Sequence, residues 1–225
     1  MNDINSQADP VAKPLHLTQI LVHYADAVRL LQVRDTYDWH QRTWQIFGGR
    51  ANASRDFLTR VDRMEEGYRL LIVSQIQPQK PDWCPSDCFS TKTIPESFFE
   101  HREYRFSLLA NPTKKVTPKG PDGRRHGQGK RIALTKREDL LTWLQRKAGL
   151  GGFVIKPDTM RTITRGLEYF HKPGAQGFHN AVEFQGTLRI ADAQRFRQTF
   201  QTGIGSAKAF GFGLLVIAPL EKRTT

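Results

Sequence analysis

Two side chains that could move protons stand one helical turn apart, at Tyr37 and His40. The segment from Tyr37 to Phe47 has the apolar periodicity of a helix, which places both side chains on the flank of its apolar face. Histidine is suited to general acid or base work because its unperturbed pKa is about 6.5. A phenol with a pKa of about 10 is a poor base, so Tyr37 would donate a hydrogen bond or orient a reacting group. We therefore select His40 as the candidate catalytic residue with Tyr37 beside it, while packing roles for both stay open.

A glycine-rich segment, residues 203–215, lies between a predicted helix and the last predicted strand. Glycine permits positive φ and close approach of another backbone, and successive N–H groups in such a loop can form an anion-binding concavity. A dinucleotide fingerprint follows a strand and opens a helix, whereas this loop has the opposite order. It therefore favours a longer polyanion, with helix-to-strand packing as the alternative. The candidate contacts in this loop are Gly203, Gly205, Lys208 and Gly211.

The chain is strongly basic, since 34 Lys and Arg against 22 Asp and Glu give a net charge of +12. Nucleic acid is the usual partner of such a domain. A membrane-surface protein is the rival, but it needs a lysine-rich amphipathic helix, and the predicted helices have globular patterns. No apolar run approaches the ~20 residues of a membrane helix, and the polar residues 1–14 predict a tail without a signal peptide. Cys84 and Cys88 are expected to be free thiols in a reducing compartment, so we expect a cytoplasmic protein with no membrane partner.

Six further motifs accompany the glycine loop along the chain. They are Tyr37-Asp-Trp-His40, Ser54-Arg-Asp-Phe-Leu58, Leu109-Ala-Asn-Pro-Thr-Lys114, Gly129-Lys-Arg-Ile-Ala-Leu134, Trp143-Leu-Gln-Arg-Lys147 and Phe184-Gln-Gly-Thr-Leu188. Through these motifs and their order, roughly residues 15 to 220 resemble the CasE family, the CRISPR-repeat endoribonucleases of the type I-E Cascade complex. The Tyr-x-x-His spacing resembles the active-site motif of that family, so the resemblance and the helix geometry select the same histidine.

The resemblance implies a metal-independent endoribonuclease without a cofactor, which cuts the hairpin of a CRISPR repeat transcript at the 3′ base of the stem. The 2′-OH next to the scissile phosphate would attack, leaving a 2′,3′-cyclic phosphate and a 5′-hydroxyl, with His40 as acid or base. The implied partners are the repeat RNA, the mature crRNA and other Cascade subunits, especially the backbone subunit beside the crRNA 3′ hairpin. Some relatives carry a lysine or serine soon after the histidine, but Gln45 stands near that lysine's place. Arg42 and Lys208 are therefore the candidate cations for the phosphate.

Other basic residues could bind the RNA backbone, although a run of charge is often only a solvated face. Those of the basic stretch are Lys114, Lys115, Lys119, Arg124, Arg125, Lys130 and Arg131. Those of the next predicted helix are Lys136, Arg137, Arg146 and Lys147. Arg165, His171 and Lys172 flank a loop at which the family uses a basic hairpin to enter the groove of an RNA stem, as the resemblance implies.

Hydrophobic periodicity predicts the elements that position these residues. In the first half we expect a strand at 16–23, the helix at 37–47, a hairpin of strands at 55–61 and 68–75, and a proline-rich stretch at 78–95 with a short strand at 91–94. In the second half we expect a strand at 103–110, a solvated basic loop or loose hairpin at 114–131, and strands at 153–163, 182–190 and 213–220. A capping box at Thr135 should open one helix with a buried stripe of Leu140, Leu141, Leu144 and Ala148, and Asp192 should cap another over Phe196 and Phe200.

Both halves approximate the order strand, helix, strand, strand, helix, strand, although the second helix of the first half has weak support. The expected fold class is α+β, with two tandem ferredoxin-like (RRM-like) βαββαβ domains. We expect these domains at 15–98, carrying His40, and at 99–220, carrying the basic loops and the glycine loop, with tails at 1–14 and 221–225.

Two alternative functions stay open. The first is an RNA-hairpin clamp that does not cut, in which His40 only packs. The second is a metal-dependent nuclease, but the sequence shows no Asp, Glu and His cluster at ligand spacing for one.

Overall fold

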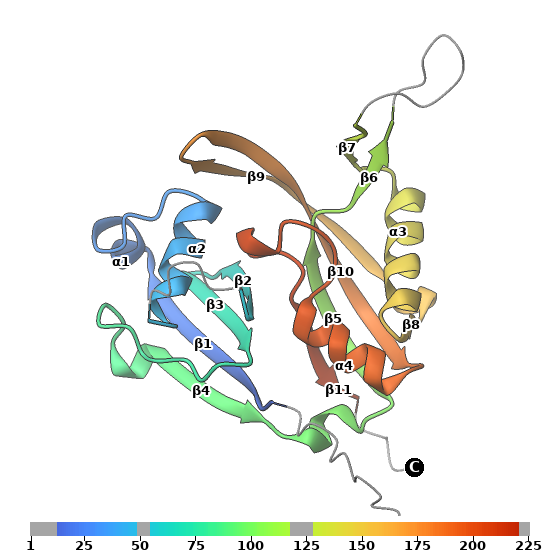
Figure 1. Cartoon of the computed structure of the whole chain (residues 1–225), viewed down its shortest axis with the longest axis horizontal. Helices are drawn as coiled ribbons and strands as arrows, with labels where there is room; N and C mark the ends of the chain where they lie inside the picture. Colours follow the sequence, from blue (N-terminus) through green and yellow to red (C-terminus); the bar gives the residue numbers. More distant parts are fainter. Residues whose placement is uncertain (1–12, 49–54, 118–127, 221–225) are drawn as a thin grey trace, which may run out of the picture.

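The computed structural model describes residues 13–48, 55–117 and 128–220, which form two antiparallel sheets lying side by side (Figure 1). The N-terminal sheet has the order β2-β3-β1-β4, from β1 (Leu15–His23), β2 (Phe57–Arg63), β3 (Gly67–Ser74) and β4 (Phe89–Ile94). The C-terminal sheet has the order β11-β5-β10-β8, from β5 (Glu103–Ala110), β8 (Phe153–Ile155), β10 (Ala175–Ile190) and β11 (Leu215–Pro219). A further strand, β9 (Arg161–Lys172), pairs with β10.

Both sheets have the strand order of a ferredoxin-like unit. In chain order, each places its first strand between its fourth and its third, and its second strand at the far edge beside the third. All of these pairs are antiparallel, as the βαββαβ connection requires. The predicted α+β class with two ferredoxin-like units is therefore confirmed.

The N-terminal sheet carries α1 (Tyr24–Arg29) and α2 (Thr36–Gln45) between its first two strands. The helix α2 confirms the prediction, and Trp39 and Thr43 are buried on its inner face. The helix α1 has no signal in the sequence, because its six residues are too few for an apolar stripe to repeat. The second helical position holds only a short 3₁₀ helix, η1 (Ser86–Cys88), where the sequence also gave weak support.

The C-terminal sheet carries α3 (Arg137–Leu150) and α4 (Ala193–Thr202). The capping-box prediction for α3 is wrong, since the N-cap is Lys136, which makes no side-chain cap. Trp143 takes the buried place expected for Leu141, which is only half-buried. The cap of α4 is confirmed, because Asp192 accepts a hydrogen bond from the backbone N–H of Arg195.

Apolar side chains fill both faces of the N-terminal sheet. Phe57 and Ile72 belong to the cluster beneath α2. Leu58 and Val73, on the opposite face, pack in one cluster with Phe200 of α4. The two sheets therefore share a buried contact, and a third cluster fills the space between the C-terminal sheet and its own helices.

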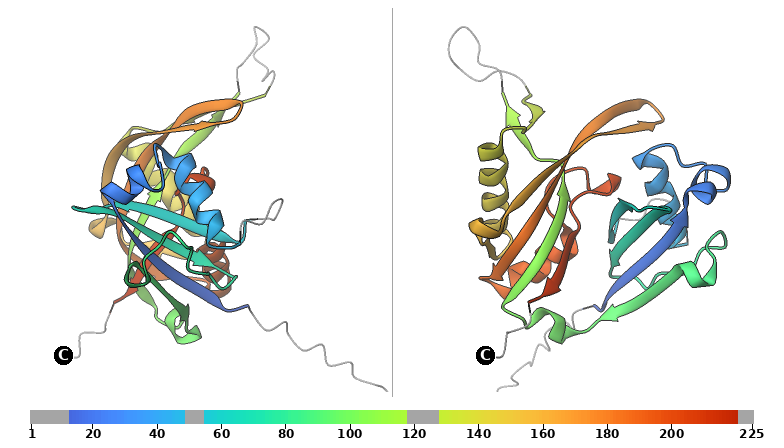
Figure 2. Two further views of the ribbon diagram at one scale, coloured as in Figure 1. Left: turned by 90° about the vertical axis from the view of Figure 1, so that its left-hand side faces the viewer. Right: turned by 180° about the vertical axis from the view of Figure 1, so that it is seen from behind.

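Two hairpins extend from the C-terminal sheet (Figures 1 and 2). The first joins β6 (Thr113–Val116) to β7 (Lys130–Ala133), and Lys119, Arg124 and Arg125 of its predicted basic stretch lie outside the described residues. The second joins β9 to β10 and reaches toward α2. The strand predicted at 153–163 is instead broken by η3 (Pro157–Thr159), and the partner strand starts at Ala175 and not at 182. The remaining short helices are η2 (Glu96–Phe99) and η4 (Lys208–Phe210).

No helix within the described parts of the chain is long and apolar enough to cross a membrane.

Candidate functional site

The helix α2 places His40 at the edge of the N-terminal sheet. Asp35 is its N-cap, and one carboxylate oxygen accepts hydrogen bonds from the backbone N–H groups of Tyr37 and Asp38. His40 is half-buried. Nε1–H of Trp44, one turn further along, donates to Nε2 of His40 over 3.0 Å. The ring of His40 therefore has a fixed place and a defined hydrogen-bond donor.

His40 lines a pocket of about 460 Å³ between the two sheets. One wall comes from α2 and β2, and the opposite wall comes from β9 and β10. The last part of the glycine loop, Ala209–Phe212, closes a third side. Its polar lining residues include Asp35, Arg60, Arg165, Glu168 and Glu183.

The surroundings of His40 disfavour its charged form. Burial and, to a smaller extent, the positive charge of Arg55 together lower its pKa to about 4. His40 is therefore neutral at pH 7 in the RNA-free protein.

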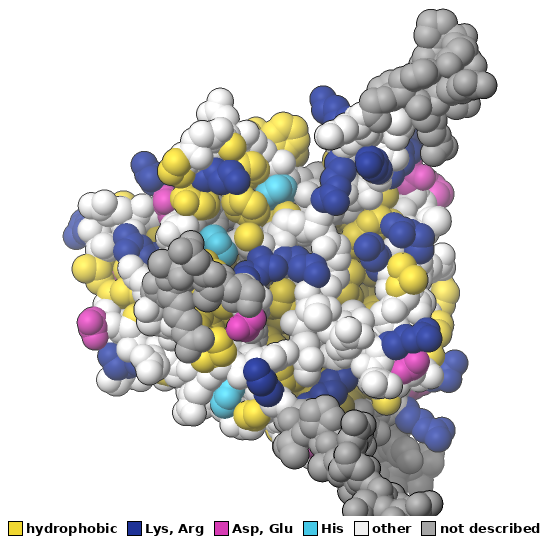
Figure 3. Space-filling view, viewed as in Figure 1, with side chains coloured by type: hydrophobic (Ala, Val, Ile, Leu, Met, Phe, Trp, Pro, Cys, Tyr) yellow, Lys and Arg dark blue, Asp and Glu magenta, His cyan; other side chains and the backbone are white. Residues whose placement is uncertain are grey.

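A second hollow, of about 500 Å³, lies on the other side of the glycine loop. Its described lining contains no Asp or Glu and presents the cations Arg55, Lys115, Arg131, Arg146, Lys147 and Lys208. Burial and neighbouring cations lower the pKa of Lys147 and of Lys208. Dark blue side chains mark the basic surface around α3 and the base of the β6–β7 hairpin in Figure 3. A site built this way attracts phosphates, which would offset the mutual repulsion of its cations.

Lys115 and Arg131 also repel each other within the β6–β7 hairpin. They are direct cross-strand partners of β6 and β7, and like charges in that position are destabilising. An anion between them would remove the penalty, so their pairing also fits a phosphate contact.

The glycine loop connects the two hollows. Gly205 to Lys208 line the basic hollow, and Ala209 to Phe212 line the pocket of His40. The loop contacts both α2 and β2 through η4. Nζ of Lys208 donates to the backbone carbonyl of Thr202, 2.6 Å away. A polyanion lying along this loop would run from the basic hollow to His40.

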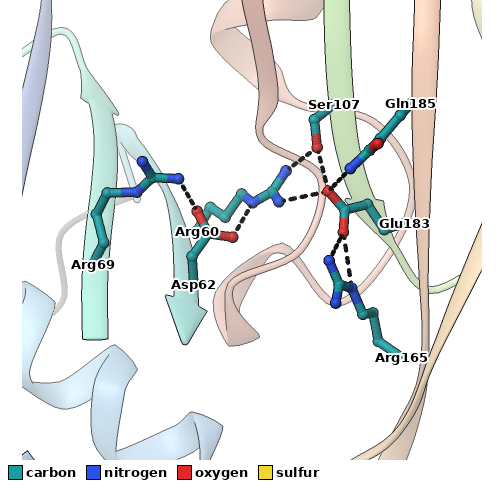
Figure 4. A network of polar contacts seen from close by, with 7 residues as sticks. All are labelled: Arg60, Asp62, Arg69, Ser107, Arg165, Glu183 and Gln185. Carbon is teal, nitrogen blue, oxygen red and sulfur yellow. Dashed lines mark hydrogen bonds and ion pairs between the residues drawn. The ribbon is translucent and has the colours of Figure 1, made fainter. Parts of the chain in front are cut away.

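Along the wall of the pocket, a polar network centred on the buried Glu183 joins the two sheets (Figure 4). Glu183 on β10 accepts from Arg60 on β2, with 3.0 Å between Nη2 and Oε1, and from Arg165 on β9. Asp62 and Ser107 complete the set around Arg60. Burial raises the pKa of Glu183, but the hydrogen bonds from its neighbours outweigh this and hold it at about 2. Arg165, a predicted RNA contact, is therefore engaged in an ion pair inside the protein.

The β9–β10 hairpin is attached directly to α2. The backbone N–H and Nδ1 of His171 lie 2.7 and 2.9 Å from Oδ2 of Asp35. Thr36 also donates to the backbone carbonyl of Tyr169. The predicted RNA contact His171 thus holds the capping residue of the helix that carries His40, and its neighbour Lys172 lies exposed at the hairpin tip.

The structure separates some of the predicted residues from His40. Arg42 donates to the backbone carbonyl of Leu31 and lines a different hollow. Tyr37 is half-buried and does not line the pocket of His40. Lys114, Lys130 and Lys136 are exposed at or beside the β6–β7 hairpin, outside the lining of the basic hollow.

Sequence reasoning missed three residues of this site. Arg55 belongs to the motif Ser54-Arg-Asp-Phe-Leu58, and its position two residues before β2 was the sequence signal that could have identified it. Trp44 lies one turn after His40 on the same helix, but its role as a donor depends on side-chain orientation. Glu183 stands directly before the motif Phe184-Gln-Gly-Thr-Leu188, in an otherwise apolar part of the predicted strand. A carboxylate buried there needs a cationic partner, and this was the sequence signal that could have identified it.

Among residues 13–48, 55–117 and 128–220, no group of three or more His, Cys, Asp or Glu side chains is arranged to hold a metal ion.

Comparison with known proteins places the chain in a family. Residues 15–219 match the model of the family described as CRISPR associated protein. The CasE subunit of the Cascade CRISPR system from Escherichia coli (strain K12) is 34% identical over 191 residues, covering 83% of this chain and 94% of that protein. The CRISPR-associated endoribonuclease Cse3 from Thermus thermophilus is 26% identical, covering 90% of this chain and 99% of that protein.

A solved structure extends the comparison to the fold. The structure of Thermus thermophilus Cse3 bound to an RNA that represents a pre-cleavage complex matches with a TM-score of 0.70 and 25% identity. The match covers 92% of this chain and 100% of that one. By sequence and by fold, this chain belongs to the CRISPR associated protein family that contains CasE and Cse3.

Proposed function

We propose that this protein is a CRISPR RNA endoribonuclease, which binds the hairpin of the repeat transcript and cuts at the 3′ base of the stem. It then keeps the processed RNA as a subunit of a cytoplasmic Cascade complex, next to the backbone subunit at the crRNA 3′ hairpin. The names of the relatives support the activity and the assembly. We further propose that residues 15–98 and 99–220 form its two domains, divided where β4 and η2 lead into β5.

The observation that carries the proposal is the path of the glycine loop. One loop lines a hollow with six cations and then the pocket of the candidate acid or base. An RNA backbone held in the hollow would bring a neighbouring phosphate to His40. Phosphate contacts of this kind position the substrate and carry little sequence information.

The chemistry needs one proton removed and one proton delivered. The 2′-oxygen attacks the adjacent phosphorus as its proton leaves, and the bond from phosphorus to the 5′-oxygen breaks as that oxygen gains a proton. His40 would perform one of the two transfers, and Tyr37 would donate a hydrogen bond to the phosphate or orient the 2′-OH. Arg55 and Lys208 are the candidate cations for the developing charge, because Arg55 is close enough to lower the pKa of His40 and Lys208 lies beside Arg55.

A clamp that binds the hairpin without cutting is the second candidate. It is favoured by one observation, since a neutral His40 with an occupied Nε2 cannot transfer a proton in the RNA-free state.

The test uses repeat RNA from the host, either unmodified or with a single 2′-deoxy nucleotide at the cleavage position, incubated with the protein in excess EDTA. We expect one cut in the unmodified RNA and none in the deoxy RNA. Tight binding of both RNAs without any cut would instead establish the clamp. Cleavage that returns only with added Mg²⁺ would overturn the proposed chemistry.

A further inference from the structure

The contact between Trp44 and His40 defines the protonation state of the histidine ring. Nε1–H of Trp44 donates to Nε2 of His40 over 3.0 Å. An indole nitrogen can only donate, so Nε2 must act as the acceptor and carry no proton. The single proton of the neutral ring therefore resides on Nδ1.

Either catalytic role requires a proton on Nε2. A base whose Nδ1 is already protonated can accept the proton of the 2′-OH only at Nε2. An acid must start as the imidazolium, which carries a proton on both nitrogens. As a base, His40 cannot use the lone pair of Nε2, because that lone pair accepts the N–H of Trp44. As an acid, the protonated Nε2 would point its N–H at the N–H of Trp44. The contact must open before His40 can act in either role.

The packing of Trp44 makes its indole a well-defined donor. Its ring meets Phe57 edge to face, with centroids 4.9 Å apart and an interplanar angle of 79°. The ring of Phe57 in turn stacks on Phe47 of the same core. These contacts hold the indole plane, so the direction of its N–H does not depend on solvent.

The carboxylates Glu183, Asp35 and Glu168 line the pocket but do not replace Trp44 as the hydrogen-bond partner of His40. Glu183 is paired with Arg60 and Arg165, and Asp35 is bound to His171 and to the N-terminus of α2. Burial raises the pKa of Glu168, and Arg55 disfavours a charged histidine. Among the described residues, none of these carboxylates accepts a hydrogen bond from His40.

We propose that Trp44 is a positioning residue that keeps His40 neutral, with its proton on Nδ1, until bound RNA breaks the hydrogen bond between them. The idea rests on the proposed function. During cleavage the bond from O2′ to phosphorus forms and the bond from phosphorus to O5′ breaks. One proton leaves the 2′-OH and one joins the 5′-oxygen, and Nε2 of His40 holds a proton at some stage of that exchange.

The first test observes the wild-type protein by ¹⁵N NMR of its labelled imidazole and indole groups. At pH 7 without RNA, His40 should show the Nδ1–H tautomer and a scalar coupling from Trp44 Nε1–H to Nε2. Adding repeat RNA with a 2′-deoxy nucleotide at the cleavage position should abolish that coupling. An Nε2–H tautomer in the free protein, or a coupling that persists in the RNA complex, would overturn the proposal.

The second test compares Trp44→Phe with Trp83→Phe. Phe at 44 keeps an aromatic ring on Phe57 but removes the donor, so the pKa of His40 should rise by about one unit. Trp83 is a matched control, because its Nε1–H donates to Gln45 over 2.8 Å and not to His40. The inflection that reports His40 in the pH profile of cleavage should move upward in the first variant alone.

An unchanged His40 pKa in folded Trp44→Phe would contradict the proposal. If the wild-type protein does not cut the RNA at all, the proposed function is refuted instead. The tautomer measurement would then still decide whether Trp44 sets the protonation state of His40.

Discussion

Asp35 and His171 stand 136 positions apart in the chain, yet one carboxylate joins them at the start of α2. Oδ1 of Asp35 caps the helix, and Oδ2 accepts both the backbone N–H and Nδ1 of His171. The carboxylate of Asp35 therefore joins the helix that carries His40 to the hairpin at the far side of the pocket. Figures 1 and 2 show the hairpin reaching across to that helix.

Replacing Asp35 with Ala should release the hairpin and weaken α2. Loss of the cap should lower the free energy of unfolding by about 0.5–2 kcal/mol. The amide of His171 loses its acceptor, so its hydrogen exchange should accelerate at least about tenfold, in line with the loss of one ordered hydrogen bond. Asp192→Ala is the matched control, since it removes the cap of α4 without touching the hairpin. Equal protection of the His171 amide in both variants would show that the hairpin is held by other contacts.

Glu183→Gln should destabilise the contact between the two sheets. Glu183 is 2% exposed, and breaking a buried ion pair typically costs about 3–5 kcal/mol. We expect the lower end of that range, because Arg60 keeps its ion pair with Asp62 and Arg165 is half-exposed. Glu103→Gln is the control, because its ion pair with Lys156 is partly exposed and should contribute at most about 1 kcal/mol. Denaturant titrations of the three proteins at pH 7 measure both differences.

The contribution of Glu183 should also depend on pH with a defined sign. Its pKa is about 2 in the folded protein against an ordinary value of 4.5, so the folded state favours the ionised form. The stabilisation is complete above pH 4.5 and is lost as the pH falls toward 2. The gap in unfolding free energy between the wild type and Glu183→Gln should therefore narrow over that window. A gap that stays constant would mean that the charge of Glu183 is not what stabilises the contact.

Substitutions in the basic hollow should weaken RNA binding mainly at low salt. Arg146→Ala and Lys147→Ala each remove a cation that lines the hollow. Each lost phosphate contact should reduce the slope of log affinity against log salt by about one, with little change in sequence preference. Lys92→Ala on β4 removes an exposed lysine outside the hollow and should leave the slope unchanged. Equal effects of all three variants would indicate non-specific attraction by net charge alone.

Gly213→Ala should destabilise the glycine loop. Gly213 has a φ of +86°, and a Cβ there would lie 2.6 Å from the backbone oxygen of Ile204. The strained backbone alone should cost about 1–3 kcal/mol. Gly149→Ala on α3 is the control, because a Cβ there meets no atom within 4 Å and should stabilise the helix by up to ~1 kcal/mol. A Gly213→Ala protein as stable as the wild type would show that the loop tolerates a rearrangement.

The sequence predicted the elements whose apolar faces are regular. The buried residues Trp39 and Thr43 of α2 stand one helical turn apart, and every second residue of β5 is buried, so both elements could be located from the sequence. The predicted strands stop short of the long β9–β10 hairpin, because the outer part of that hairpin extends beyond the core. There Leu167, Tyr169 and Phe178 are exposed, and no buried face imposes alternation.

The site was less predictable, because its contacts join distant parts of the chain. His40 and Lys208 could be selected by residue type and local pattern. The ion pairs of Glu183 and the link from Asp35 to His171 depend on how the two sheets pack, which no local spacing reveals. The donor role of Trp44 depends on a side-chain orientation that the core around Phe57 sets.

The most direct test of the account is cleavage by His40→Ala, compared with His23→Ala at an exposed position of β1. Each variant, in excess over the RNA, would be incubated with the host repeat hairpin in the presence of EDTA, and the product ends would be identified. We predict that His40→Ala binds the hairpin as the wild type does but does not cut it, whereas His23→Ala yields the 2′,3′-cyclic phosphate at the wild-type rate. Cleavage by His40→Ala at the wild-type rate would contradict the assignment of His40 as the group that moves the proton.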